Sequence, residues 1–191
     1  MLRRSRELFA DILRQTDLVL LALCAAASLF GVLMVASATR YMHTWRLVAV
    51  QSVALLLGVV LYLVISQIDL NDLCKYWKWI FLVGVVGILL LVTPLGIADN
   101  TGNRAWLDFP FLPVKVQPAE IVKLTLTLVL AKQLVWLKEN RNLSSIPSVL
   151  FLAAHLGVIF VLYYKVSSDM GSALVFLFIF ACMCFVGGVA L

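Results

Sequence analysis

The sequence predicts an all-α fold, a polytopic bundle of transmembrane helices. The first reason is composition: 63% of the 191 residues are hydrophobic and 13% are charged, whereas soluble domains average about 25% charged residues. The second reason is that the hydrophobic residues gather into runs of roughly 20, the length that a helix needs to cross a bilayer core of ~30 Å. Most Lys and Arg residues lie between these runs, as in the loops of membrane proteins.

Six stretches are long and apolar enough to be membrane spans. They are Leu18–Ala38, Leu47–Ile65, Trp79–Ala98, Pro118–Leu137, Ile146–Tyr164 and Met170–Leu191. The sixth carries no charge and reaches the last residue, whereas the segments flanking a span usually carry the Lys and Arg that set its orientation. We therefore expect the sequence to be the first part of a longer protein, with residues 1–17 as a tail and residues 18–191 as one incomplete transmembrane domain.

The Lys and Arg residues predict a cytoplasmic amino terminus. With this orientation nine of them face the cytoplasm and five face the outside, in agreement with the excess of positive charge in cytoplasmic loops. The cytoplasmic set is Arg3, Arg4, Arg6, Arg14, Lys75, Lys78, Lys132, Lys138 and Arg141. The tail before the first span places apolar residues at helical spacing, which fits either a membrane-surface helix or an extension of the span.

The net charge of +5 does not indicate a nucleic-acid-binding protein. The basic residues are scattered among loops, without the patch that a nucleic-acid interface needs. The four cysteines likewise give no disulfide framework and no zinc-type spacing. We interpret them as packing residues, and no cofactor is evident in the sequence.

The connection Asp99–Val116 is the longest loop predicted on the outer side. It keeps apolar residues such as Trp106 and Phe109 among polar ones such as Arg104. Long loops with this composition tend to pack back onto the protein or to dip into the membrane interface, and they often carry function. We therefore predict a binding role for this loop.

The fourth span opens with a stripe of polar side chains. Pro118 suits the first helical position, and spacing of three or four residues places Gln117, Glu120, Lys123 and Thr127 on one face. Ionisable residues inside a membrane are costly and usually functional. One interpretation is an ion pair that holds two helices together. The other is a hydrated cavity, open to the outside, that handles an anionic, lipid-linked substrate.

Two further polar features lie in the last two spans. Asp169 precedes the sixth span, where an aspartate is most often an N-cap that accepts backbone hydrogen bonds. Gly171 and Ser172 would allow another helix to approach closely. His155 lies in the middle of the fifth span and is either a packed, hydrogen-bonded side chain or part of a proton relay.

Three motifs make the sequence resemble the SEDS family, the RodA, FtsW and SpoVE proteins of bacterial cell-wall synthesis. Residues 102–106 read Gly-Asn-Arg-Ala-Trp and resemble the family's Gly-Ala-Arg-Arg-Trp. Residues 117–123 read Gln-Pro-Ala-Glu-Ile-Val-Lys and are similar to Gln-Pro-Ser-Glu-x-x-Lys. Residues 169–175 read Asp-Met-Gly-Ser-Ala-Leu-Val and resemble Asp-Leu-Gly-Thr-Ala-Leu-Val, although Ser167 and Ser168 replace the usual Gln-Pro.

The resemblance implies a peptidoglycan glycosyltransferase of about ten helices in the bacterial cytoplasmic membrane. Such proteins polymerise lipid II on the outer face of that membrane, for cell shape or cell division, together with a class B penicillin-binding protein. Their catalytic aspartate follows the seventh helix, so it would lie beyond residue 191. The resemblance assigns cavity or substrate-binding roles within this sequence to Gln117, Glu120, Lys123, Arg104, Trp106 and Asp169.

Two other functions remain open from the sequence. A polar cavity between helices would also suit a flippase that moves lipid II across the membrane, and a protein without catalysis could act as a membrane scaffold for the elongation or division machinery. For the enzyme, Lys123 or a bound divalent cation could offset charge that develops on phosphate. These 191 residues alone would be inactive without the missing aspartate.

Overall fold

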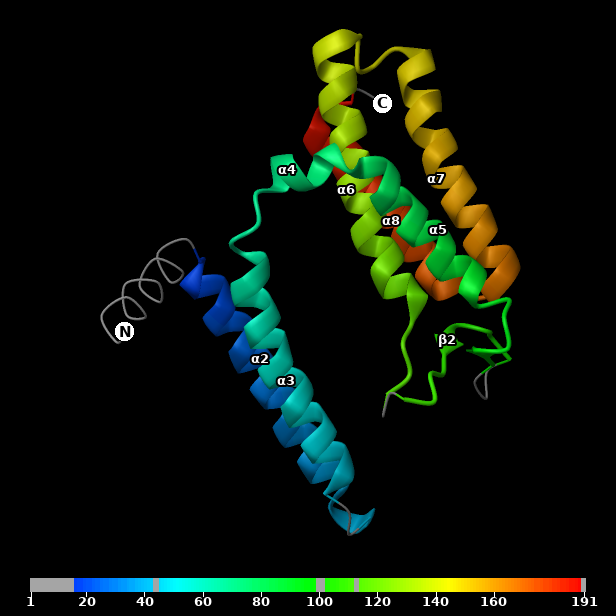
Figure 1. The fold of residues 1–191 in the computed structure, drawn as a ribbon. Coiled ribbons are helices and arrows are strands. Elements are labelled where there is room, and N and C mark those ends of the chain that lie inside the picture. The colour runs from blue at the N-terminus through cyan, green and yellow to red at the C-terminus, as the bar shows by residue number, and fades with distance from the viewer. Residues whose placement is uncertain (1–15, 43–44, 99–101, 112–113, 190–191) are drawn as a thin grey trace. The chain divides into compact units, whose positions relative to one another are not determined.

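The computed structural model describes the chain except residues 1–15, 43–44, 99–101, 112–113 and 190–191. The described residues are predominantly helical (Figure 1), so the predicted all-α fold class is confirmed. The chain divides into two compact units, Met1–Leu70 and Asn71–Leu191. The predicted helical tail lies almost wholly outside the described residues. Of residues 1–17, only Thr16 and Asp17 are described.

The first unit is a helical hairpin. Helix α2 (Leu18–Ala38) is followed by the short 3₁₀ helix η1 (Arg40–Met42) and by α3 (Arg46–Ile65), which packs beside α2. Asp17 caps α2 by accepting hydrogen bonds from the N–H groups of Val19 and Leu20, both at 3.0 Å. The Tyr62 hydroxyl of α3 donates to the Asp17 carbonyl at 3.0 Å. No residue of either helix is buried within the described structure, so nearly all of this apolar surface is available to lipid or to other helices.

The second unit is built around one central helix, α6 (Pro118–Asn140). It contacts α5 (Trp77–Leu90), α7 (Ile146–Ser167) and α8 (Met170–Gly187), whereas the short α4 (Leu70–Lys75) precedes α5 (Figure 1). The buried apolar residues of α6 recur at three- and four-residue spacing, which places them on one side of the helix. They include Ala119, Val122, Leu126, Leu130, Leu134 and Leu137. On α5, a Cβ at Gly84 would collide with the Thr125 side chain of α6, so glycine is what permits this close helix approach.

The loop between α5 and α6 contains a small antiparallel sheet. Strand β1 (Gly96–Ile97) pairs with β2 (Trp106–Leu107), and Leu107 also forms a bridge with Val116, immediately before α6. Ala105 and Leu107 are buried. The prediction that this loop packs back onto the protein is therefore confirmed, whereas the expectation of purely helical architecture misses the sheet.

The predicted span Trp79–Ala98 is wrong in its second half. Helix α5 ends at Leu90, and the chain turns through Thr93 and Pro94 into β1. A proline disfavours helical backbone at the residue before it and lacks an N–H for the helix. Hydropathy alone does not register this break, because the turn and β1 are themselves largely apolar.

Four of the six predicted spans correspond to helices long and apolar enough to cross a membrane. Among the described residues these are α2, α3, α7 and α8, and α5 is a shorter apolar helix. Helix α6 has 23 residues but carries several charged side chains, so its composition differs from that of the other four. The sixth predicted span is helical to Gly187, where Gly188, at φ +86°, ends the helix in the left-handed conformation.

A Gly96→Ala substitution should destabilise the second unit. A Cβ at this position would overlap the Leu91 carbonyl and crowd the Arg104 guanidinium, and such overpacking costs about 1–3 kcal/mol. The measurement is the melting temperature of the intact protein in detergent micelles. Gly157→Ala is the control, because a Cβ at Gly157 in α7 meets nothing within 4 Å. Equal melting temperatures for the two variants would contradict the close packing at Gly96.

Candidate functional site

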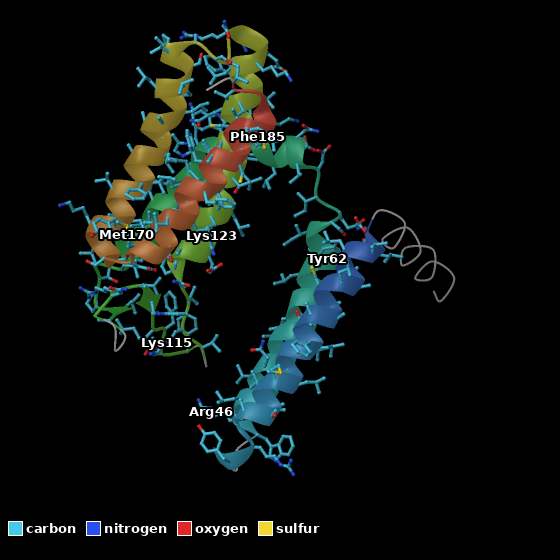
Figure 2. The ribbon with its side chains drawn as sticks, turned by 180° about the vertical axis from the view of Figure 1, so that it is seen from behind. Arg46, Tyr62, Lys115, Lys123, Met170 and Phe185 are labelled. Carbon is cyan, nitrogen blue, oxygen red and sulfur yellow. The ribbon has the colours of Figure 1, made fainter. Side chains whose placement is uncertain are left out.

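The candidate residues lie at one end of the second unit, where the α5–α6 loop meets the ends of three helices. The Leu107–Val116 bridge ties the loop to the start of α6, with N···O distances of 2.7 and 2.9 Å. The Arg104 N–H donates to the Ser167 carbonyl at 2.9 Å, which ties the loop to the end of α7. In Figure 2, Lys123, Lys115 and Met170 mark this end of the unit.

Glu120 and Lys123 form an ion pair on the first two turns of α6. The Lys123 Nζ lies 2.7 Å from each of the two Glu120 carboxylate oxygens. The pair joins two turns of one helix, and within the described residues neither side chain is shown bonded to a second helix. The positive end of the helix dipole favours the carboxylate at this position.

Both partners of the pair reach the surface of the described structure. The Glu120 side chain is 62% exposed and the Lys123 side chain 27% exposed. An ion pair between neighbouring turns at the surface of a helix contributes only about 0.2–0.5 kcal/mol. Stability therefore gives little reason for placing two charges here, and the exposed carboxylate is available to a ligand or to another part of the protein.

The predicted polar stripe continues along α6. The Thr127 hydroxyl donates to the Lys123 carbonyl at 2.8 Å, and Thr127 is exposed. Gln117 is the N-cap residue of α6, but its side chain makes no capping hydrogen bond. The Gln117 amide thus remains available at the start of the stripe.

Arg104 holds the loop in shape. Its Nε donates to the Gly96 carbonyl and its Nη2 to the Thr93 carbonyl, both at 3.0 Å. Both carbonyls lie beyond the last regular turn of α5, and the Thr93 carbonyl also accepts a hydrogen bond from the Gly96 N–H at 3.0 Å. Trp106, on β2, pairs with Ile97 and is half-buried. Both residues therefore build the loop that covers this end of the unit.

Asp169 is the N-cap of α8, as its position in the sequence predicted. Its carboxylate accepts hydrogen bonds from the Ser172 N–H at 3.2 Å, the Ser172 hydroxyl at 2.6 Å and the Tyr163 hydroxyl at 3.1 Å. The Tyr163 ring is fully buried and packs edge-on against Phe176 at 5.2 Å between ring centroids. This network couples α7 to α8.

The hydrogen bonds lower the pKa of Asp169. Burial raises the pKa of this carboxyl, but the hydrogen bonds from Ser172, Tyr163 and the Gly171 N–H outweigh it, so the pKa lies below the ordinary value of 3.8. The group is ionised at neutral pH and its acceptor positions are occupied, which favours a structural role over a direct role in chemistry.

His155 is a packed, hydrogen-bonded side chain. Its Nδ1 lies 2.9 Å from the Gln133 Oε1 of α6, and the ring packs edge-on against Phe81 of α5 at 5.3 Å. The Nε2 is buried without a hydrogen-bond partner among the described residues. Within that part of the chain, the contacts of His155 supply no series of titratable groups for the proton relay considered from the sequence.

The structure joins some of the predicted residues and leaves others apart. Arg104 and Asp169 belong to one hydrogen-bonded region through Ser167, because the Asp169 N–H donates to the Ser167 hydroxyl at 3.1 Å. Glu120 and Lys123 are linked to that region only indirectly, because Val116, just before α6, forms backbone hydrogen bonds with Leu107 of the loop. Sequence reasoning missed Tyr163 and Gln133. Gln133 could have been found in the sequence as a polar residue within an apolar helix. No sequence pattern near Tyr163 indicates that its hydroxyl binds the Asp169 carboxylate.

The described residues contain no evident metal site. Among the residues that the structure describes, no group of three or more His, Cys, Asp or Glu side chains is placed to hold an ion. The divalent cation that the sequence left possible has no ligand set within that part of the chain.

The sequence model of the FtsW/RodA/SpoVE family, described as "Cell cycle protein", matches residues 15–191. The chain belongs to this family. Among curated relatives, the probable peptidoglycan glycosyltransferase FtsW of Saccharophagus degradans is 31% identical over 185 residues, which cover 93% of this chain and 46% of that protein. The corresponding protein of Geobacter metallireducens is 31% identical over 168 residues, covering 83% of this chain and 43% of that protein.

Solved structures of the FtsW/RodA/SpoVE family have the same architecture. The rod shape determining protein RodA of Thermus thermophilus superposes with a TM-score of 0.75 at 30% identity, covering 92% of this chain and 55% of RodA. A chain from a peptidoglycan synthase complex that coordinates polymerisation and crosslinking gives 0.76 at 30% identity, covering 91% of this chain and 48% of that one. The present chain thus spans about half the length of its relatives.

The Asp169 network predicts a pH-dependent contribution to stability. Because the pKa of Asp169 is lower in the folded state than its ordinary value of 3.8, the contribution is present above pH 3.8 and is lost as pH falls below it. Asp169→Asn should therefore melt below wild type at pH 7, by an amount equivalent to about 1 kcal/mol. The difference should shrink as the pH falls below 3.8.

The measurement is the melting temperature of the intact protein in micelles between pH 7 and pH 3. Asp108→Asn, which changes an exposed carboxylate in the same region, is the matched control. If wild type and the Asp169→Asn variant differ by the same amount over this whole range, the charge of Asp169 does not matter.

Proposed function

We propose that the intact protein is a peptidoglycan glycosyltransferase that polymerises lipid II into glycan strands. Membership of the FtsW/RodA/SpoVE family carries this proposal, because relatives over 30% identical across most of this chain are named peptidoglycan glycosyltransferases. The exposed ion pair on α6 supports it with chemistry suited to an anionic substrate. The four apolar helices of spanning length support a bacterial inner-membrane location. The amino terminus is proposed to be cytoplasmic.

The reaction makes two chemical demands. The acceptor hydroxyl must lose a proton as it attacks the anomeric carbon, and the bond to the departing lipid pyrophosphate must break with its negative charge stabilised. We propose that the Lys123 ammonium meets the second demand and that Glu120, 2.7 Å away, holds it in position. We expect the general base to be a carboxylate outside these 191 residues.

The remaining candidates shape the site. Arg104 and Trp106 hold the α5–α6 loop in shape, and Asp169 couples the start of α8 to α7. Gln117, whose side chain leaves the helix uncapped, is available to hydrogen-bond the sugar or phosphate groups of lipid II. Misplacement by even about 1 Å in such a supporting shell can cost catalysis heavily.

Partners follow from the same proposal. A relative of known structure forms part of a peptidoglycan synthase complex that coordinates polymerisation with crosslinking. We propose that a class B penicillin-binding protein supplies the crosslinking partner here. The flippase alternative would use the same polar surface, but the names of the relatives do not favour it.

Polymerisation of lipid II by the intact protein, purified with its crosslinking partner and read out as glycan strands on a gel, tests the function. Strand formation supports the proposal. If the protein forms no strands but exposes lipid II to the opposite leaflet of vesicles, the flippase function replaces it.

Substitution of the ion pair tests the site. Glu120→Ala or Lys123→Ala should lower the polymerisation rate about tenfold, which corresponds to about 1.4 kcal/mol of transition-state stabilisation. Because the two groups act as one unit, the double variant should be no worse than the more damaging single variant. Lys138→Ala and Glu139→Ala, exposed at the other end of α6, should leave the rate unchanged. Rates are compared at equal membrane protein level by immunoblot.

Exchanging the two charged residues tests whether the ion pair has a structural role or a role in the reaction. The double variant Glu120→Lys with Lys123→Glu retains an ion pair but reverses its order along the helix. If Lys123 serves an anionic substrate, this variant should lose activity. Wild-type activity in the exchanged protein would show that the pair is only structural.

A further inference from the structure

A cavity lies in the part of the Asn71–Leu191 unit that is remote from the α5–α6 loop. It has a volume of about 280 Å³ and is lined by Trp77, Lys132, Gln133, Trp136 and Phe151. Trp77 begins α5, Trp136 precedes the end of α6, and Phe151 lies early in α7, so these positions share one end of the unit. None of the residues named in the proposed polymerase site contributes to it.

The walls of this cavity are aromatic. The Trp136 and Phe151 rings lie 6.4 Å apart between centroids, and the three aromatic side chains are all partly exposed. Tryptophan is enriched where a membrane protein meets the headgroup region of the bilayer. The volume is near the lower limit of small-molecule sites, roughly 300–1,000 Å³. It suits a small polar group with the first part of an apolar chain and is too small for a helix.

Three basic side chains lie in or beside the cavity. Lys132 lines the cavity itself, and none of the five lining residues is acidic. The Lys78 ammonium lies 5.7 Å from the Trp77 ring, and the Arg141 guanidinium 5.7 Å from the Trp136 ring. Such cation–π contacts hold these positive groups beside the walls. An apolar pocket with a basic margin complements a lipid with a negatively charged headgroup.

We propose that this cavity binds an anionic phospholipid, such as phosphatidylglycerol, from the cytoplasmic leaflet. The phosphate lies against Lys132, with Lys78 and Arg141 contributing to the attraction, and the acyl chains lie against the aromatic rings. Basic pockets between helices on the cytoplasmic side recognise lipid headgroups in this way. Gln133 lines the cavity and also binds His155, so the lipid would stabilise the contact of α6 with α7. The proposal does not depend on polymerase activity.

Native mass spectrometry of the intact protein from nanodiscs that contain phosphatidylethanolamine and phosphatidylglycerol tests this site. Wild-type protein should retain phosphatidylglycerol in preference to phosphatidylethanolamine. Lys132→Gln should weaken its retention about fivefold, the effect of about 1 kcal/mol for one cation near an anionic lipid. Trp136→Ala should weaken retention of both lipids, because it removes an apolar wall.

Lys138→Gln is the matched control. It removes the same charge from the same helix, but six residues further on, about 240° around the helix axis, and should retain phosphatidylglycerol like the wild type. Equal losses for the Lys132 and Lys138 variants would show a general surface effect and overturn the proposal. Two results for the wild-type protein alone would also overturn the proposal. One is equal retention of the two lipids, and the other is no retained lipid because a partner fills the cavity. Neither result depends on whether a variant folds.

Discussion

The packing of α6 against three neighbours is the interaction on which the rest of the second unit depends. One side of this helix carries a continuous apolar row that α5, α7 and α8 cover. Lys123 lies beside this row and is partly buried, whereas Glu120 and Thr127 are exposed. Burial of the apolar row against the three helices leaves Glu120 and Thr127 at the surface of the unit, so the core of the unit determines where its charges lie.

The need to satisfy backbone groups at helix ends explains most of the other polar side chains. Water is scarce in and near a bilayer core, so each free N–H or C=O group there needs a partner in the protein. Arg104 provides donors for carbonyls after α5, and Asp169 provides an acceptor for N–H groups at the start of α8. Two residues of the family-like motifs therefore have structural functions that are sufficient to explain their positions. The Glu120–Lys123 pair has no such explanation, which is why it carries the proposed chemistry.

Local patterns were sufficient to predict the fold class, the four long apolar helices, the ion-pair spacing and the Asp169 cap, because each depends on residues close together in the sequence. The end of α5 was predicted incorrectly, since the hydropathy of the residues beyond Leu90 outweighed the signal from Pro94. Contacts between distant residues were not predictable from spacing. Gln133 and His155 are 22 residues apart, and Arg104 reaches carbonyls 8 and 11 residues earlier. Such pairs form only when whole helices and loops are placed.

Helix α6 has different polar chemistry at its two ends. At the loop end a carboxylate and an ammonium neutralise each other in one pair, so that end is polar without a large net charge, which suits the proposed substrate with its sugar hydroxyls and phosphates. At the other end Lys132 borders an aromatic cavity that has no acidic lining residue, so the net positive charge there favours a purely anionic headgroup. The two proposals assign different ligands to the two ends, so the proposed lipid would not need to compete with the proposed substrate. It would still act on the same helix, since both sites use side chains of α6.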